Sequence, residues 1–302
     1  MQMKRKVRKK QWHDEIAGWL FVAPAVLGFL LLTIVPMLIS LYYSFCEFDG
    51  VSVPRFIGFD NYVRLFSGKD PFFRSAVIAT VSYTVIGVPV YLVYSLMLAM
   101  LVHLAVKARG FFRTALFLPS VIPAIASCLL WKWMCDPSLG VLNNTLKLFG
   151  IYTKMRWFYS SETVIFTFIL MWMWGCGTTM VVMLAGLEDV PKSLYDAMKV
   201  DGGGAVAGFW HVTLPMISPS LLFCVIVSFV NAIQCFVPAY SITNGGPGNR
   251  SLFYLFYMYR EAFSFSDMGG ACAIAWLLFL VLLVMTQLIS LAANKYVYYG
   301  GE

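Results

Sequence analysis

The chain has 302 residues, of which 60% are hydrophobic and only 12% are charged, and its formal net charge is +7. A soluble domain is nearer half apolar and a quarter charged, so this composition excludes an ordinary soluble domain and indicates a protein that crosses a membrane several times. The seven cysteines are scattered without a C-x-x-C pair, which disfavours a disulfide framework or a zinc site.

Residues 1–17 form a basic tail. Under the positive-inside rule, such a run predicts a cytoplasmic location. Binding to nucleic acid is disfavoured because no folded basic module accompanies the run. The first apolar segment is too long, and too poor in a cleavage signal, for an ordinary signal peptide. The basic residues of the tail are Lys4, Arg5, Lys6, Arg8, Lys9 and Lys10.

Six apolar runs of membrane length follow the tail. About 20 apolar residues are needed to cross a bilayer as a helix. The sequence therefore predicts an all-α membrane protein, with a transmembrane domain over 18–294, a short tail over 295–302 and both termini in the cytoplasm. The expected spans are 18–45, 75–104, 112–134, 163–187, 219–240 and 270–293.

The polar segments between these runs are predicted to alternate across the membrane. Segments 46–74, 135–162 and 242–268 are expected outside, and an aromatic run at 253–265 is predicted to lie at the membrane interface. Other lysines and arginines occur on both faces, so the basic tail and one short connection decide the orientation. That connection contains Lys107, Arg109 and Arg113.

Proline interrupts several of the expected spans. Pro89 is predicted to kink the second span, which a helix bundle tolerates because neighbouring groups satisfy the freed backbone. The third span contains Pro119 and Pro123.

Residues 188–217 form the only long polar segment between two apolar runs of membrane length. Pro191 or Ser193 is predicted to begin a short helix, with Leu194, Tyr195 and Met198 as its apolar stripe. A stop at Asp201 and Gly202 follows, because glycine readily supplies the left-handed residue that ends many helices. A second short helix is expected over 205–212, so the segment is a helix–stop–helix module.

This module resembles the cytoplasmic loop of bacterial importer permeases, the membrane subunits of ATP-binding-cassette (ABC) uptake systems. The family pattern is an acidic residue, two small residues, three of any kind, Gly, nine of any kind, Ile, one of any kind, Leu and Pro. Aspartate replaces glutamate, methionine replaces the second alanine, and valine replaces isoleucine. The matching positions are Asp196, Ala197, Met198, Gly202, Val212, Leu214 and Pro215.

Three further stretches resemble the sugar-transporting branch of these permeases. They are FLPSVIPAIASCLLWKW from Phe117, DPSLGVLN from Asp136 and TNGGPGN from Thr243. The resemblance implies the type I importer fold, with six transmembrane helices and a coupling helix between the fourth and fifth. It places the chain in the bacterial inner membrane. It also implies four partner subunits: a second homologous permease, two cassette ATPases that hold ATP and Mg²⁺, and an extracytoplasmic solute-binding protein.

The resemblance also assigns the loop the role of coupling to the ATPases. Asp196 is expected either to pair with a basic group of an ATPase or to cap backbone donors within the loop. The residues expected to couple are Leu194, Tyr195, Asp196, Ala197, Met198, Asp201 and Gly202.

No catalytic constellation is found in the sequence. The glycine-rich stretches 202–204 and 245–248 do not lead into Gly-Lys-Ser/Thr, which a phosphate-binding loop needs. We therefore expect the chain neither to hydrolyse ATP nor to bind a cofactor or metal. His13, His103 and His211 are isolated and are interpreted as structural or solvated residues.

The spans themselves carry little charge. No Asp, Glu, Lys or Arg lies between the ends of the second, fourth, fifth or sixth span. Ionisable groups in a membrane mark proton relays and ion pathways, so this argues against a proton-coupled carrier and against a strongly charged substrate.

A neutral path through the membrane is the remaining candidate. Trp172 and Trp174 lie about 15 Å into the fourth span, and Ser228, Asn231 and Gln234 share one face of the fifth span. Aromatic faces with amide and hydroxyl groups suit a neutral polyol. The alternative is that the amides bond between helices and the indoles merely pack.

The resemblance to maltose-type permeases places sugar contacts in the spans before and after the loop. Ala232 and Cys235 stand where that relative has amides, so the substrate or its pose differs. The predicted path residues are Trp174, Gly175, Thr178, Ser228, Asn231, Gln234 and Cys235.

The sequence thus predicts a permease subunit that imports a sugar or oligosaccharide by alternating access. A substrate of the glycerol-phosphate type is an alternative within the family. Outside the family, the alternatives are a stand-alone secondary transporter and a membrane scaffold without a substrate.

Overall fold

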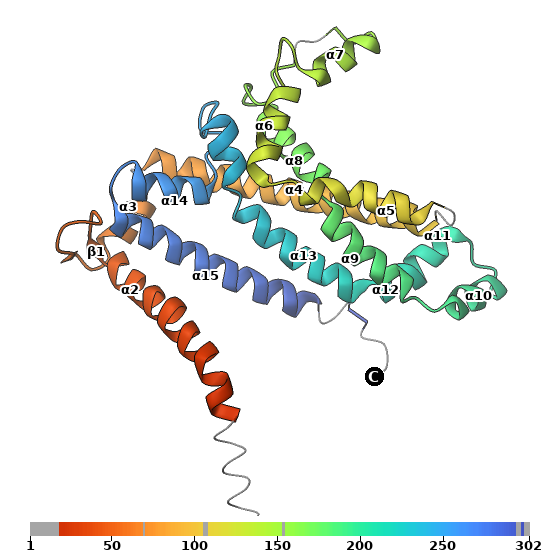
Figure 1. Ribbon diagram of the computed structural model, residues 1–302, viewed down its shortest axis with the longest axis horizontal. Helices are drawn as coiled ribbons and strands as arrows, with labels where there is room; N and C mark the ends of the chain where they lie inside the picture. The colour runs from red at the N-terminus through yellow and green to blue at the C-terminus, as the bar shows by residue number, and fades with distance from the viewer. Residues whose placement is uncertain (1–17, 69, 105–107, 153–154, 294–296, 299–302) are drawn as a thin grey trace, which may run out of the picture. The chain divides into compact units, whose positions relative to one another are not determined.

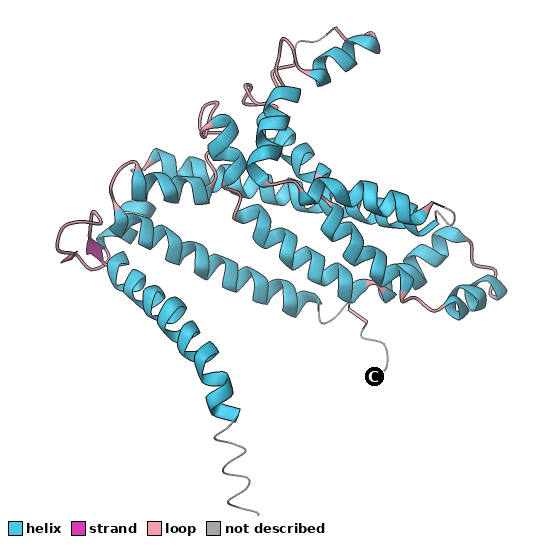
Figure 2. Ribbon diagram, in the orientation of Figure 1, coloured by secondary structure: helices cyan, strands magenta, loops and turns pink. Residues whose placement is uncertain are grey.

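The computed structural model describes residues 18–68, 70–104, 108–152, 155–293 and 297–298, and these are almost entirely helical (Figures 1 and 2). The basic tail 1–17, Lys107 and most of the tail 295–302 lie outside the described residues. The chain divides into two compact units, residues 1–66 with 261–277, and residues 67–260 with 278–302.

The six predicted spans are all present. Three are continuous helices, Gly18–Ser44, Pro71–Leu104 (α4) and Met268–Ala293 (α15). The other three are bent pairs of helices, which together have the length and hydropathy of a span. These pairs are Arg109–Val121 with Ala124–Met134, Val164–Trp174 with Gly177–Glu188, and Ala205–Met216 with Ser218–Ile233.

Each bent pair breaks where the sequence interrupts the helical hydrogen bonds. The third span consists of α5 (Arg109–Phe117), the 3-10 turn η2 (Leu118–Val121) and α6 (Ala124–Met134), and it turns by 97°. Pro119 and Pro123 account for this turn, because proline lacks an N–H and clashes with the preceding helical turn. The fourth span turns by 54° between α8 (Val164–Trp174) and α9 (Gly177–Glu188).

The fifth span begins inside the polar loop. Its first part is α11 (Ala205–Gly208), the π-helical turn η3 (Phe209–Thr213) and α12 (Leu214–Met216), and α13 (Ser218–Ile233) follows at 69°. The π-helical η4 (Ala239–Thr243) follows after a break at Gln234 to Phe236, and Pro238 stands immediately before it. The second short helix that we expected over 205–212 is therefore confirmed, as the start of this bent span.

Helix α4 is the centre of the larger unit and packs against α8, α9 and α13. Gly87 lets α8 approach, since a Cβ there would lie 3.3 Å from Ile169 and 3.4 Å from Trp172. Gly177 brings α9 against the third span, because its Cβ would lie only 2.7 Å from the Cα of Phe117. Gly87 thus makes room for side chains of α8, and Gly177 lets α9 lie against the backbone of the third span.

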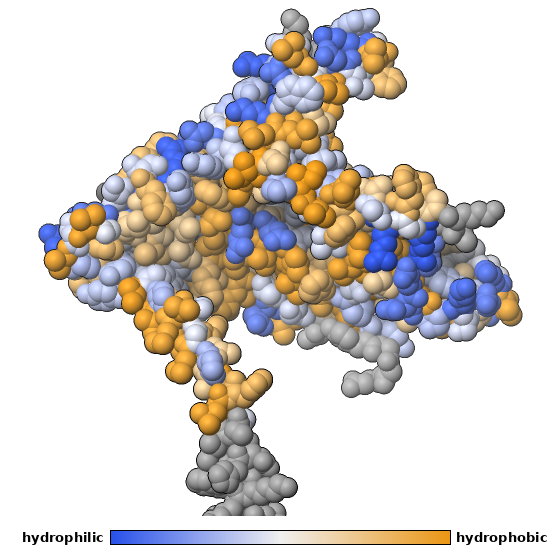
Figure 3. Space-filling view, in the orientation of Figure 1, coloured by the Kyte–Doolittle hydropathy of each residue, from blue (hydrophilic) through white to orange (hydrophobic). Residues whose placement is uncertain are grey.

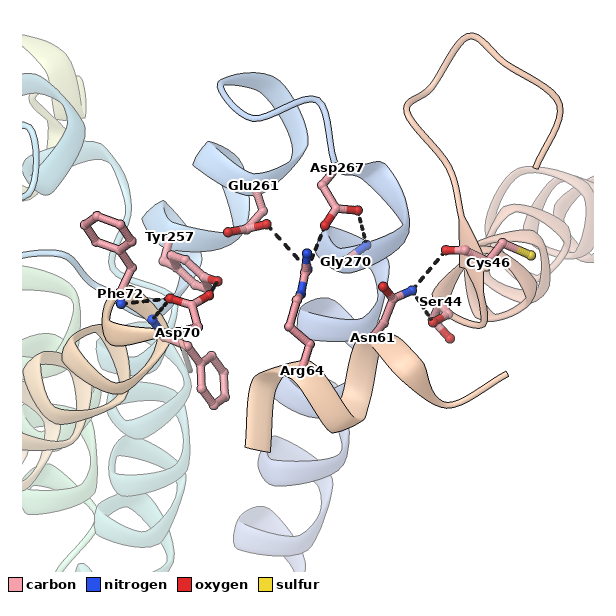
Figure 4. Close-up of polar contacts among 11 residues, drawn as sticks. Ser44, Cys46, Asn61, Arg64, Asp70, Phe72, Tyr257, Glu261, Asp267 and Gly270 are labelled. Carbon is pink, nitrogen blue, oxygen red and sulfur yellow. Dashed lines mark hydrogen bonds and ion pairs between the residues drawn. The ribbon is translucent and has the colours of Figure 1, made fainter. Parts of the chain in front are cut away.

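The first unit contains the Gly18–Ser44 helix, whose outer half is η1 (Leu30–Ile34) and α2 (Val35–Ser44). A short antiparallel hairpin follows, β1 (Cys46–Glu47) with β2 (Arg55–Phe56), and then α3 (Asp60–Phe66). Asn61 is buried and donates to the carbonyl oxygens of Ser44 and Cys46, at 3.0 and 2.9 Å (Figure 4). This amide therefore joins α3 to the end of α2.

Arg64 forms the second polar link of this unit. It pairs with Asp267 at 2.6 Å and with the buried Glu261 at 3.6 Å (Figure 4). Gly270 lies directly beside the pair, and a Cβ at that position would overlap the guanidinium of Arg64 and the carboxylate of Asp267. We call Arg64, Glu261, Asp267 and Gly270 the outer network.

The segment at 253–265 differs from its prediction. Phe253, Phe256 and Tyr257 are at most 1% exposed, so the start of α14 (Tyr254–Phe263) packs inside the protein and not at a lipid interface. Tyr257 donates to the carboxylate of Asp70, which also accepts from the first N–H groups of α4 (Figure 4). The prediction failed because aromatic residues alone do not distinguish an interface from a core.

Polar side chains gather at the ends of the helices. On the face drawn in Figure 3, the surface over α2 is hydrophobic, and hydrophilic side chains gather around α7 (Val141–Leu148) and α10 (Lys192–Val200). This is the distribution expected for spans that face lipid and loops that face water.

Candidate functional site

A cavity of about 360 Å³ lies beside a break in each of the three bent spans. The breaks are at Ile122 and Pro123 in the third span, at Gly175 and Cys176 in the fourth, and at Gln234 to Phe236 in the fifth, beyond its 69° bend near Ile217. Discontinuous helices are tolerated at membrane depth where they line a cavity, and they commonly form transport sites. The lining residues are Tyr83, Pro119, Ser120, Ile122, Ser127, Phe168, Met171, Trp172, Trp174, Gly175, Asn231, Gln234, Cys235, Phe236, Val237 and Pro238.

The structure brings five of the seven predicted path residues to this cavity. They are Trp174, Gly175, Asn231, Gln234 and Cys235.

Two predicted path residues lie elsewhere. Thr178 is exposed but does not line the cavity, and Ser228 is buried at 2% exposure. Ser228 lies one turn below Asn231, and its side chain is already enclosed by the packed helices. Of the three residues predicted to share one helical face, Asn231 and Gln234 therefore line the cavity and Ser228 does not.

Aromatic rings form one wall of the cavity. Trp172 stacks on Tyr91, with ring centroids 4.2 Å apart and planes at 11°, and it lies 5.6 Å from the ring of Tyr83. Trp174 meets Trp131 edge to face at 6.1 Å. Stacked and edge-to-face pairs stabilise one ring orientation, so the cavity presents fixed aromatic surfaces.

Sequence reasoning missed the contribution of the second and third spans. Tyr83, Ser120 and Ser127 supply polar groups to the cavity. The prolines at 119 and 123 were the available signal, because an interrupted helix inside a membrane indicates a cavity.

The cavity is neutral as far as the described residues show. Its lining contains amides, hydroxyls, a thiol and aromatic rings, without a lysine, arginine, aspartate or glutamate. Such a lining suits a ligand that has hydroxyl groups and apolar faces. The described residues also include no group of three side chains that could hold a metal ion.

The module at 188–217 has the predicted helix–stop–helix form. Helix α10 begins after Pro191, which is extended at the N-cap position, and Ser193 makes no capping bond. Gly202 has φ +80°, the left-handed conformation that the sequence predicted there. The stop therefore depends on a glycine at this position.

The apolar stripe of α10 does not face only outward. The Tyr195 hydroxyl lies 2.8 Å from that of Thr213, and Met198 packs where a Cβ on Gly203 or Gly208 would otherwise lie. Leu194 is 39% exposed.

The remaining predicted coupling residues face solvent. Ala197, Asp201 and Gly202 are exposed. Asp196 pairs with Lys199 of its own helix at 3.3 Å, and both side chains are more than two thirds exposed. The exposed residues of α10 therefore include the apolar Leu194 and Val200, 39% and 88% exposed, as well as this polar pair.

These features can be compared with those of known proteins. Residues 65–296 match the family described as "Binding-protein-dependent transport system inner membrane component". The chain belongs to this family. It is therefore a membrane-spanning permease, the transport component of an importer that depends on a binding protein, and it resides in the inner membrane.

Two relatives match this permease over nearly its full length. The probable ABC transporter permease protein YesP of Bacillus subtilis is 33% identical and covers 100% of this chain and 97% of its own. The lactose transport system permease protein LacF of Rhizobium radiobacter is 34% identical, with 95% and 96% covered.

The crystal structure of a bacterial ABC transporter that imports the acidic polysaccharide alginate contains a similar chain. It matches the permease with a TM-score of 0.80 at 21% identity, over 95% of this chain and 99% of that one. The predicted type I importer arrangement of six transmembrane helices is therefore confirmed.

Proposed function

We propose that this permease imports a neutral sugar or oligosaccharide, which passes through the cavity at the three helix breaks. The observation that carries the proposal is the neutral lining, which contains both the Trp172 and Trp174 rings and the amides of Asn231 and Gln234. Sugars have apolar C–H faces and hydroxyl groups that need partners, so rings and amides match both. The 34% identical lactose permease supports the same class of substrate.

The partners follow from the family to which the chain belongs. We infer a second homologous permease, two cassette ATPases that bind ATP and Mg²⁺, and an extracytoplasmic solute-binding protein that delivers the sugar. Both termini would lie in the cytoplasm, on the same side as α10. ATP-driven closure of the ATPases would move α10, and the cavity would then change the side to which it opens.

Two rival functions find less support. A proton-coupled secondary transporter needs ionisable groups along its path, and the described lining of the cavity has none with an ordinary pKa near neutrality. A glycerol-phosphate substrate would need cationic donors for its phosphate, and the described lining contains no lysine or arginine.

Uptake into proteoliposomes tests the proposal. The complete complex is reconstituted with its binding protein outside and ATP inside, and labelled lactose, maltose and glycerol 3-phosphate are offered separately. We expect uptake of a neutral saccharide that requires both ATP and the binding protein. Uptake without ATP would favour a secondary transporter, and uptake of glycerol 3-phosphate alone would overturn the assignment to sugars.

A further inference from the structure

The inner face of α10 is closed by its own loop. Tyr195 and Thr213 are joined through their hydroxyls at 2.8 Å, although 18 residues separate them in the sequence. Thr213 is buried, and its hydroxyl also donates to the carbonyl oxygen of Gly208 at 3.2 Å. One polar chain therefore connects α10 with both α11 and η3.

Met198 adds an apolar contact next to this chain. A Cβ on Gly208 would lie 2.9 Å from Cε of Met198 and 3.9 Å from the ring of Tyr195. A Cβ on Gly203 would overlap the Met198 sulfur. The two glycines thus leave the space that methionine fills at a position where the family pattern has alanine.

The residues that lead into α10 have contacts of their own. Glu188, at the end of α9, pairs with Arg109 of α5 at 2.6 Å, with the side chains 41% and 36% exposed. A half-exposed ion pair is screened by solvent and contributes little. Val190 follows and is buried at 7% exposure, so α10 is anchored at its start as well as through its links to α11 and η3.

We propose that Tyr195, Met198 and Thr213 are positioning residues that clamp α10 onto the start of the fifth span. The two helices of the loop then move as one body, and motion of α10 is delivered along α12 and α13 to Asn231 and Gln234. This proposal rests on the import function proposed above. It also changes the role of Tyr195 and Met198, which hold the loop together and leave Leu194 and Ala197 to face a partner.

Distances between spin labels test the clamp directly. One pair is placed at the exposed Ser193 and Val206, across the loop, and a second pair at the exposed Leu101 and Phe223, across α4 and α13. The complete complex is measured without nucleotide and after trapping with ATP and vanadate. We expect the loop pair to keep one distance in both states while the second pair changes.

Removal of the hydroxyl link should loosen the loop. Tyr195→Phe should lower the ratio of closed to open loops about fivefold, the change expected for one hydrogen bond of about 1 kcal/mol, and it should reduce the response of the second pair. Thr213→Val should do the same, and the double variant should be no looser than Thr213→Val alone. Loop distances in Tyr195→Phe identical to those of the parent would overturn the clamp.

The glycine contacts give a matched control. Gly203→Ala should open the loop, because its Cβ would overlap the Met198 sulfur and lie 2.9 Å from Cγ of Met198, and Gly203→Ala combined with Met198→Ala should restore the parental distance. Gly204→Ala should have no effect, because a Cβ there has no neighbour within 4 Å. Equal effects of the two single glycine substitutions would contradict the packing argument.

Failure of the clamp and failure of the import function give different results. A loop pair that changes its distance in the parent would refute the clamp whatever the substrate. If the distance of the second pair does not change with ATP in the parent, the ATP-driven mechanism and the delivery of motion are refuted. The distance of the loop pair still tests the clamp in that case.

Discussion

The outer network and the clamp of the loop both hold helices together, but with different chemistry. The outer network holds helices with a guanidinium and two carboxylates, of which Glu261 is buried. The clamp uses two neutral hydroxyls and a thioether, and Tyr195 and Met198 are only partly buried. A buried charge left without its partner is costly, whereas a neutral hydrogen bond can open at small cost. The difference indicates a rigid outer network and a loop at 188–217 that stays closed but can be displaced.

The largest effect is expected from Arg64→Met. This change removes the guanidinium that pairs with Asp267 at 2.6 Å and with the buried Glu261 at 3.6 Å, and it should cost about 3 kcal/mol of stability. Thermal unfolding of the purified complex measures it. Arg55→Met is the matched control, because its pair with Glu47 is 78% and 68% exposed and should contribute about 0–1 kcal/mol. Equal losses in both variants would remove the distinction between a buried and an exposed ion pair.

Glycine substitutions sharpen the same comparison. Gly270→Ala should destabilise the protein by about 1–3 kcal/mol, because its Cβ meets charged groups that are held by several partners. Gly208→Ala should cost less, since the end of a methionine side chain moves easily and alanine is the better helix former. The midpoint of thermal unfolding is measured for each variant. A larger loss of stability in Gly208→Ala than in Gly270→Ala would contradict the assignment of the outer network as the more rigid region.

A substitution in the cavity should affect transport and leave both ends intact. Asn231→Leu removes a hydrogen-bonding group and should weaken substrate use by about 0.5–1.5 kcal/mol, or about 2- to 13-fold in uptake at low substrate concentration. Val227→Ala on the same helix does not line the cavity and serves as the control. Unchanged uptake in Asn231→Leu would favour a role in helix packing.

The smallest effect is expected at Asp49, in the turn after β1. Its carboxylate accepts hydrogen bonds from the Ser52 hydroxyl and from the backbone of Ser52 and Val51, which lower its pKa to about 2. The stabilisation is complete above the unfolded pKa of about 3.9 and is lost as the pH falls through about 2. Ser52→Ala should raise this pKa toward its ordinary value, as an NMR titration would report. An unchanged pKa would show that the backbone donors suffice.

The number and order of the spans could be predicted from the sequence because hydrophobic length is a local property. The stop at Gly202 could be predicted for the same reason, because the residue that takes the left-handed conformation is itself the glycine. The contacts between Tyr195 and Thr213, and between Arg64 and Asp267, could not be predicted, because they join separate elements. The stripe on α10 was interpreted as exposed for that reason, since nothing local shows that α11 covers it.

The residues of the cavity also fall into a group that could be predicted from the sequence and a group that could not. Asn231 and Gln234 could be found from one helical face, and Trp174 from its depth. Tyr83 and Ser120 reach the cavity only because α4 and the bent third span fold against α8 and α13. Their place depends on packing between helices that are far apart in the chain.

The contacts of the first helix have a consequence for how the chain is made. Ser40 accepts a hydrogen bond from the Trp276 indole at 3.1 Å, and Arg64 pairs with Asp267 at 2.6 Å. The ribosome completes the first helix and α3 long before it reaches their partners Asp267 and Trp276. A nascent chain that stops before residue 267 therefore lacks both of these contacts, and the end of its first helix is held by the hydrogen bonds from Asn61 to the carbonyl oxygens of Ser44 and Cys46.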